Sequence, residues 1–197
     1  AHWTRDAATQ TWTVELLPDN GPGFSSEALS FIVKDLVPPA APKDFLAGHV
    51  QTDTSPQVPC VWEEQPGGGF NLVELPMTPG AYLGGIVALQ NICTNHGLFG
   101  ECFSAVGYNA IPGDIDFYRG VVYERVNGVW GAPEALPPAA GYRDSRATGV
   151  VPGTSNSPDG VTVVGHSYME LSEGTERATL WELPPDGTLW IYDVNDL

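Results

Sequence analysis

Two histidines and a tyrosine occupy one position of a repeated pattern. His49, Tyr108 and His166 each follow a glycine that ends a short apolar stretch. Side chains at the same position of stacked repeats lie side by side, so these three would form a polar row on one face, where a ligand could bind. The alternative is that each is a polar side chain at the end of a strand, with no ligand.

The sequence carries no recognised catalytic or metal-binding motif. His-Glu-x-x-His, paired Cys-x-x-Cys, Gly-x-Ser-x-Gly and Ser-x-x-Lys are all missing from it, so neither a zinc site nor an activated serine is expected. Asp114 and Asp116 could offer oxygen ligands to calcium, but the further oxygens that a calcium loop supplies are not visible. A solvated acidic loop is the alternative, and we expect no cofactor.

The three cysteines divide into a pair and a single residue. Cys93 and Cys102 are nine positions apart around a glycine-containing turn, a spacing that suits a disulfide across a hairpin and favours an oxidising compartment. Two reduced thiols in a cytosolic protein are the alternative. Cys60 falls where other repeats carry Val121 and Thr179, so we expect it to be buried and unreactive.

The charge of the chain excludes some partners. The 24 acidic residues outnumber the 8 basic ones, for a formal net charge of −16, which repels phosphate backbones and anionic lipid headgroups. No apolar run reaches the length of about 18 residues that a membrane-spanning helix needs. We therefore expect neither nucleic acid nor direct membrane insertion.

Regularly spaced aromatics predict the elements that position these residues. The first aromatic of each unit recurs after 59, 61 and 58 positions, and a second follows it by seven to nine residues across a polar or glycine-rich turn, which predicts a hairpin. A strand ending in glycine precedes each complete hairpin. The first aromatics are Trp3, Trp62, Tyr123 and Trp181, the second are Trp12, Phe70, Trp130 and Trp190, and the glycines are Gly48, Gly107 and Gly165.

A four-stranded sheet of this kind has two apolar faces and is stable only when stacked on its neighbours, with the aromatics and glycines in the core of the repeat. We therefore predict an all-β, propeller-like array of antiparallel blades of about 59 residues. Residues 1–23 would form half a blade, and residues 24–80, 81–141 and 142–197 one blade each. Because a closed propeller needs at least four blades, the ring would be incomplete unless further blades of the same polypeptide or a protein partner complete it, and an open solenoid is the alternative.

The last unit resembles a known repeat. Residues 160–167 (GVTVVGHS) and 178–181 (ATLW) are similar to the probable extracellular repeat named after its His-Ala-Phe signature, and the third unit carries a related AVGYN at 105–109. The second unit matches less well, with AGH at 47–49. The resemblance implies a bacterial, exported, propeller-like protein, and it brings no catalytic residues.

Three classes of function fit these patterns. We expect a non-catalytic scaffold or protein-interaction module that is secreted, periplasmic or on the cell surface, such as a subunit of a larger envelope assembly. A carbohydrate-binding or adhesive module is the first alternative, and it requires that exposed tyrosines gather on one face. A propeller-type lyase or hydrolase, whose residues converge from several blades, is the second. The tyrosines concerned are Tyr82, Tyr142, Tyr168 and Tyr192.

Overall fold

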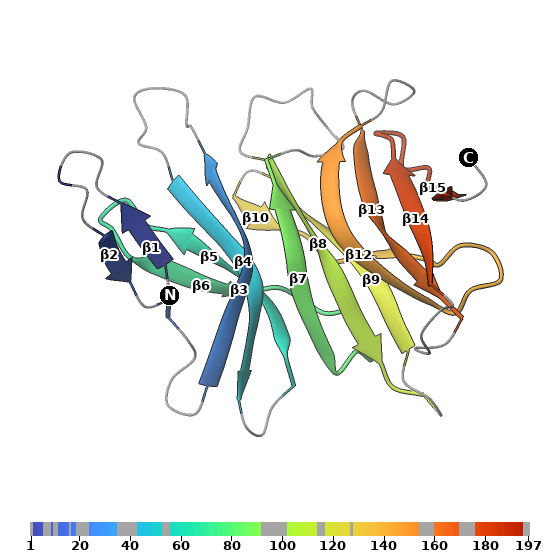
Figure 1. Ribbon diagram of the computed structural model, residues 1–197, viewed down its shortest axis with the longest axis horizontal. Helices are drawn as coiled ribbons and strands as arrows, with labels where there is room; N and C mark the ends of the chain where they lie inside the picture. The colour runs from blue at the N-terminus through green and yellow to red at the C-terminus, as the bar shows by residue number, and fades with distance from the viewer. Residues whose placement is uncertain are drawn as a thin grey trace.

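The protein is all-β, as predicted from the sequence. The computed structural model describes residues 2–5, 9, 12–15, 17–18, 24–34, 43–52, 56–91, 102–113, 117–126, 128–153, 160–169 and 176–194. Within these residues there is no α-helix, and the strands form one two-stranded hairpin and three larger antiparallel sheets (Figure 1).

Strands that follow one another along the chain also pair with one another. The hairpin contains β1 (His2–Arg5) and β2 (Trp12–Glu15). The first sheet contains β3 (Phe24–Lys34), β4 (Lys43–Thr52), β5 (Val58–Glu64) and β6 (Phe70–Glu74). The second contains β7 (Leu83–Gln90), β8 (Cys102–Ile111), β9 (Phe117–Val126) and β10 (Val129–Trp130), with β11 (Glu134–Leu136) also paired to β9. The third contains β12 (Asp144–Pro152), β13 (Val161–Tyr168), β14 (Glu176–Leu183) and β15 (Trp190–Asp193).

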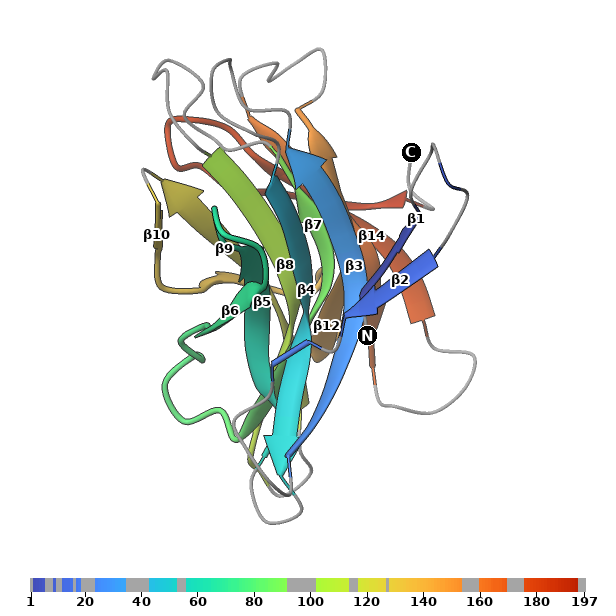
Figure 2. The same cartoon turned by 90° about the vertical axis from the view of Figure 1, so that its left-hand side faces the viewer.

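The three sheets follow one another along the long axis of the molecule, with the hairpin at one end (Figures 1 and 2). Strand β7 lies against β3, β4 and β5, and β12 lies against β7, β8 and β9. Apolar side chains fill the space between sheets, since each strand presents alternate residues to opposite faces. Phe45, Ala47 and Val61 meet Phe103 and Tyr123 between the first two sheets, and Val106 and Val122 meet Val163 and Trp181 between the second and third.

The glycines expected to end strands instead lie inside them, within β4, β8 and β13, so that expectation is wrong. A β-bulge in the neighbouring strand is what requires glycine there. Gly48, Gly107 and Gly165 each pair with the residue just before a shift of register in the first strand of their sheet. A Cβ atom at any of them would overlap a backbone carbonyl oxygen of that strand, namely that of Glu27, Gly85 or Arg146. Only glycine therefore fits at this point of the repeat.

Indole side chains tie sheets to the segment that precedes them. Trp62 and Trp181 are fully buried, and each donates its Nε1–H to the carbonyl oxygen of a proline, Pro18 and Pro137 respectively, at 2.7 Å. Both prolines follow the leucine that closes the previous unit. The equivalent Tyr123 is also fully buried, and its hydroxyl lies 3.5 Å from Asn109 Nδ2.

The second aromatic of each unit does not always reach the core. Phe70 and Trp130 pack against buried clusters, but Trp190 is 55% exposed, so its expected core position is wrong. Trp190 pairs with Glu182, one residue after Trp181, and this register turns its side chain to the opposite face. Leu189 packs against the core in its place. The side chains of Trp3 and Trp12 lie outside the described part of the structure.

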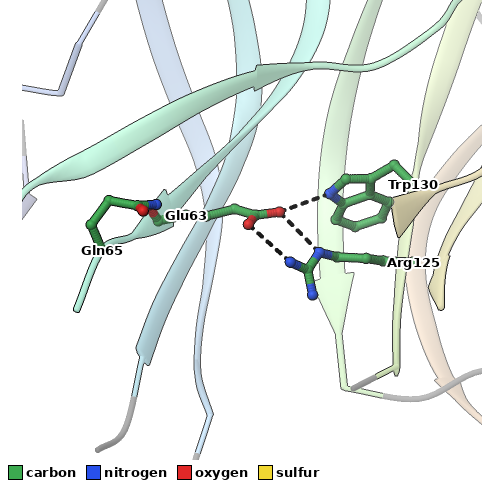
Figure 3. A network of polar contacts seen from close by, with 4 residues as sticks. All are labelled: Glu63, Gln65, Arg125 and Trp130. Atoms are coloured by element: carbon green, nitrogen blue, oxygen red, sulfur yellow. Dashed lines mark hydrogen bonds and ion pairs between the residues drawn. The ribbon is translucent and has the colours of Figure 1, made fainter. Parts of the chain in front are cut away.

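A polar network links the first two sheets (Figure 3). Arg125 Nε and Nη2 each donate a hydrogen bond of 2.9 Å to the carboxylate of Glu63, and Trp130 Nε1 donates another of 3.1 Å. The Arg125 guanidinium also lies 5.5 Å from the centre of the Phe45 ring. This pairing offsets the cost of burying both charges.

Candidate functional site

The repeated bulge and glycine bring the polar row of His49, Tyr108 and His166 to the same end of all three sheets. Each of these residues directly follows its glycine and pairs with a residue of the first strand: His49 with Glu27, Tyr108 with Gly85, and His166 with Arg146. This is the end at which β4, β8 and β13 finish, at the bottom of Figure 1. The three first-strand residues differ in charge. The repeat therefore fixes where these side chains lie, and the residue types give each sheet a different local charge at that place.

His49 and Tyr108 approach each other at Gly85, which has no side chain. A Cβ atom on Gly85 would lie 3.4 Å from the Tyr108 hydroxyl and 3.7 Å from His49 Nδ1. His49 Nδ1 is buried and has no hydrogen-bond partner among the described residues, while Nε2 lies 3.2 Å from Gln57 Nε2 and 3.8 Å from Glu27 Oε2. Glycine at position 85 thus allows side chains from two sheets to meet.

Arg146 is the centre of a second group of side chains, which we call the Arg146 cluster. Its guanidinium carbon lies 3.8 Å from the centre of the Tyr118 ring, 5.2 Å from that of Tyr108 and 5.9 Å from that of Tyr168. The His166 ring is 6.1 Å from that of Tyr168. The cluster therefore comprises Arg146, Tyr108, Tyr118, Tyr168 and His166, contributed by β8, β9, β12 and β13, and all five are half-buried.

Burial shifts the pKa of three side chains in this region toward their neutral forms. Desolvation lowers the pKa of His49, against the opposing effect of Glu27. Desolvation raises the pKa of Tyr108, with Arg146 acting in the opposite direction. The pKa of Tyr168 is raised in the same way, mainly by desolvation. At neutral pH His49 is therefore a neutral imidazole, and Tyr108 and Tyr168 are neutral phenols.

Further arginines lie around the cluster. The guanidinium carbons of Arg119 and Arg143 lie 5.7 and 5.8 Å from the centre of the Phe117 ring, and Arg177 Nε donates a hydrogen bond of 3.0 Å to the Tyr142 hydroxyl. The acidic groups near it include Asp144, which accepts a hydrogen bond from the backbone N–H of Tyr118, and Glu176, which pairs with Tyr168 across β13 and β14. Glu27 is a third, and its charge raises the pKa of Tyr108. Four arginines thus gather at one end of a strongly acidic protein.

A separate hollow of about 440 Å³ lies over β9, β10 and β11. Glu124 and Glu134 face it, and burial together with the charge of Glu124 raises the pKa of Glu134. Within the described residues, no three His, Cys, Asp or Glu side chains are grouped as metal ligands would be. These two carboxylates therefore lack the further ligands that a cation site needs.

Other predicted site residues fall in different places. Cys60 is buried and free, and burial raises the pKa of its thiol. Cys93 lies outside the described residues, so its disulfide with Cys102 stays a prediction. Asp114 and Asp116 also lie outside them, which leaves the calcium hypothesis untested.

The tyrosines of the carbohydrate hypothesis are partly gathered. Tyr168 belongs to the Arg146 cluster, and Tyr142 binds Arg177 at the same end of the third sheet. Tyr192 instead lies on β15, where its hydroxyl donates a hydrogen bond to Glu182. Sequence reasoning missed Arg146 and Tyr118. Their signal was the concentration of arginine and tyrosine between residues 117 and 177.

The fold and the site together define a class of protein, an all-β chain of stacked antiparallel sheets with a polar, aromatic row along one end. The chain matches no protein-family model, no curated protein and no solved structure. Among the described residues, no helix has the length and apolar character needed to span a membrane.

Proposed function

We propose that this protein is a non-catalytic scaffold outside the cytoplasm that packs against further sheets of its own kind, those of a second copy of the chain, in a larger propeller-like assembly. The exposed face of the third sheet carries this proposal. The predicted disulfide and the resemblance to an extracellular repeat support the location outside the cytoplasm.

The outer face of the third sheet, directed away from the second sheet, repeats residues that are buried elsewhere. Val164 stands one position before its glycine, as Ala47 and Val106 do. Ala47 and Val106 are fully buried between sheets, whereas Val164 is 39% exposed. Val151 and Trp190 share this face, at 44% and 55% exposure. An exposed apolar face of this kind marks an interaction site.

Continuity with the two internal interfaces indicates what covers the outer face. Twice within the chain, the face bearing the residue before the glycine packs against the first strand of a following sheet, β7 or β12. The outer face has the same strand order, the same bulge and an apolar residue at the same position. A sheet of the same construction is therefore the partner that fits it.

Self-association of the purified chain tests the proposal. We expect light scattering to give a mass above that of one chain, increasing with protein concentration. Val164→Glu should shift the protein to the monomer, because a carboxylate would be buried without a partner in the interface. Circular dichroism checks that the variant keeps its β-structure.

Val129→Glu is the matched control, since Val129 is 71% exposed on the second sheet and the substitution is the same. It should leave the assembly unchanged. A wild-type protein that stays monomeric at every concentration, or an assembly that Val164→Glu leaves intact, would refute the proposal.

Carbohydrate binding is the second candidate function, and the Arg146 cluster favours it. Tyrosine rings and an arginine on a rigid sheet scaffold are suited to a polar ligand with both apolar and hydroxyl-bearing faces.

A further inference from the structure

We propose that the Arg146 cluster is a binding site for the carboxylate of an acidic sugar, a uronic acid within a polysaccharide. The site borders the outer face of the third sheet, because His166 and Tyr168 lie on the same side of β13 as Val164. Its centre is where Arg146 of the third sheet meets Tyr108 and Tyr118 of the second, and the inference makes no use of self-association. It rests on an unpaired guanidinium, three tyrosine rings and the local charge.

Among the described residues, the guanidinium of Arg146 has no carboxylate partner, whereas that of Arg125 has one. Arg125 binds both oxygens of Glu63 through Nε and Nη2. Arg146 Nε is buried and has no hydrogen-bond partner, and within the described residues no carboxylate forms an ion pair with this side chain. A buried donor of a charged group without a partner is costly, so a missing partner is indicated. The two oxygens of a carboxylate can accept parallel hydrogen bonds from Nε and one Nη of a guanidinium, as Glu63 does from Arg125.

The tyrosines give the site its preference for a sugar. Tyr108, Tyr118 and Tyr168 surround the guanidinium, and no hydrogen bond of their hydroxyls is present within the described residues. Aromatic rings pack against the C–H faces of a sugar, while phenolic hydroxyls and the His166 ring can bind its hydroxyl groups. A small inorganic anion would use the arginine alone.

Local charge makes an anionic ligand acceptable to a protein of net charge −16. Arg119, Arg143 and Arg177 lie at the same end of the sheets as Arg146. Asp144 is engaged by the backbone of β9, and Glu176 lies beside Tyr168 at the start of β14. These arginines offset part of the acidic charge at this end, to which Glu27 also contributes, and so lower the repulsion that an anion meets.

Calorimetric titration with a trimer of galacturonic acid tests the assignment, with its fully methyl-esterified form as the neutral control. We expect the trimer to bind, and the ester, which has the same rings but no charge, to bind at least tenfold more weakly. Binding should weaken as salt is added, because part of the interaction is between exposed charges.

Three variants locate the site. Arg146→Gln should weaken binding of the trimer at least tenfold. Tyr168→Ala should also weaken binding of the trimer. Because the Tyr168 ring is half-exposed, this variant should fold, and it tests the site even if Arg146→Gln does not fold. Tyr192→Ala is the control for Tyr168→Ala, because Tyr192 lies on β15 outside the cluster, and it should change affinity less than twofold.

Several results would overturn the proposal. They are a trimer that does not bind, an ester that binds as well as the acid, and folded Arg146→Gln protein with wild-type affinity. Inorganic phosphate that displaces the trimer at equal concentration would also count against it, because it would show a general anion site.

Discussion

Glu63 at the end of β5 and Arg125 in β9 form a two-point ion pair that joins the first sheet to the second, with both hydrogen bonds 2.9 Å long. Arg125→Met removes one partner and leaves the other charge largely buried, so we expect a loss of about 3–5 kcal/mol in the free energy of unfolding. Urea denaturation measures it. The double variant with Glu63→Gln should recover part of the loss, and a single variant that costs less than about 1 kcal/mol would show that the pair is not needed.

The bulge glycines should tolerate no side chain. In Gly107→Ala the new methyl group would overlap the carbonyl oxygen of Gly85. We expect the free energy of unfolding to fall by about 1–3 kcal/mol. Gly67→Ala is the control, because nothing lies within 4 Å of a Cβ atom at that turn position. Its thermal midpoint should match or slightly exceed that of the wild type. Equal losses in the two variants would contradict the role given to the bulge.

The indole of Trp181 should contribute through its hydrogen bond as well as its size. Trp181→Phe leaves the carbonyl oxygen of Pro137 without its partner and opens a small cavity, which we expect to cost about 1–3 kcal/mol or more. Trp190→Phe makes the same change at an exposed position and should cost less than about 0.5 kcal/mol. Denaturant midpoints of the two variants decide between these expectations.

Cys60 should be inert in the folded protein, because burial raises the pKa of its thiol and keeps reagents away. Native protein treated with iodoacetamide should gain no adduct on Cys60 by mass spectrometry. Unfolding without a reductant should give one adduct if Cys93 and Cys102 are joined, and unfolding with a reductant should give three. Three adducts without reductant would disprove the predicted disulfide.

His49 should make the protein less stable in mild acid. Burial lowers its folded pKa below the ordinary value of 6.5, so between these two values the unfolded chain binds the proton more readily. The contribution of neutral His49 to stability is complete above pH 6.5 and decreases as the pH falls toward the folded pKa. The free energy of unfolding of wild type minus that of His49→Gln should therefore decrease from pH 7.5 to pH 5. A constant difference would exclude this role.

The local pattern predicted the strands better than it predicted which face a side chain would occupy. Gly48, Gly107 and Gly165 could be recognised as recurring positions, but they were expected at the ends of strands and lie inside them. The bulges that require them involve a neighbouring strand and leave no local signal. Trp190 was misplaced because it pairs with Glu182, one residue after Trp181. Phe70 and Trp130 instead pair with the residue two positions after the first aromatic of their unit. A change of one residue in register turns a side chain to the other face.

The site was predicted only in part for a similar reason. The repeat identified His49, Tyr108 and His166 as equivalent positions. Arg146 became visible only through its pairing with His166, since the first strands vary most in sequence. Tyr118 reaches the cluster from another sheet, a contact between residues 28 positions apart that no spacing rule contains.

The first-strand residues of the polar row give the molecule a direction. They change from Glu27 in the first sheet, through Gly85, to Arg146 in the third. Two copies joined back to back by a twofold axis would set their third sheets face to face and reverse this order at the junction. Head-to-tail packing keeps the order from copy to copy, as cyclic symmetry does, so the chain's direction distinguishes a ring from an isologous dimer.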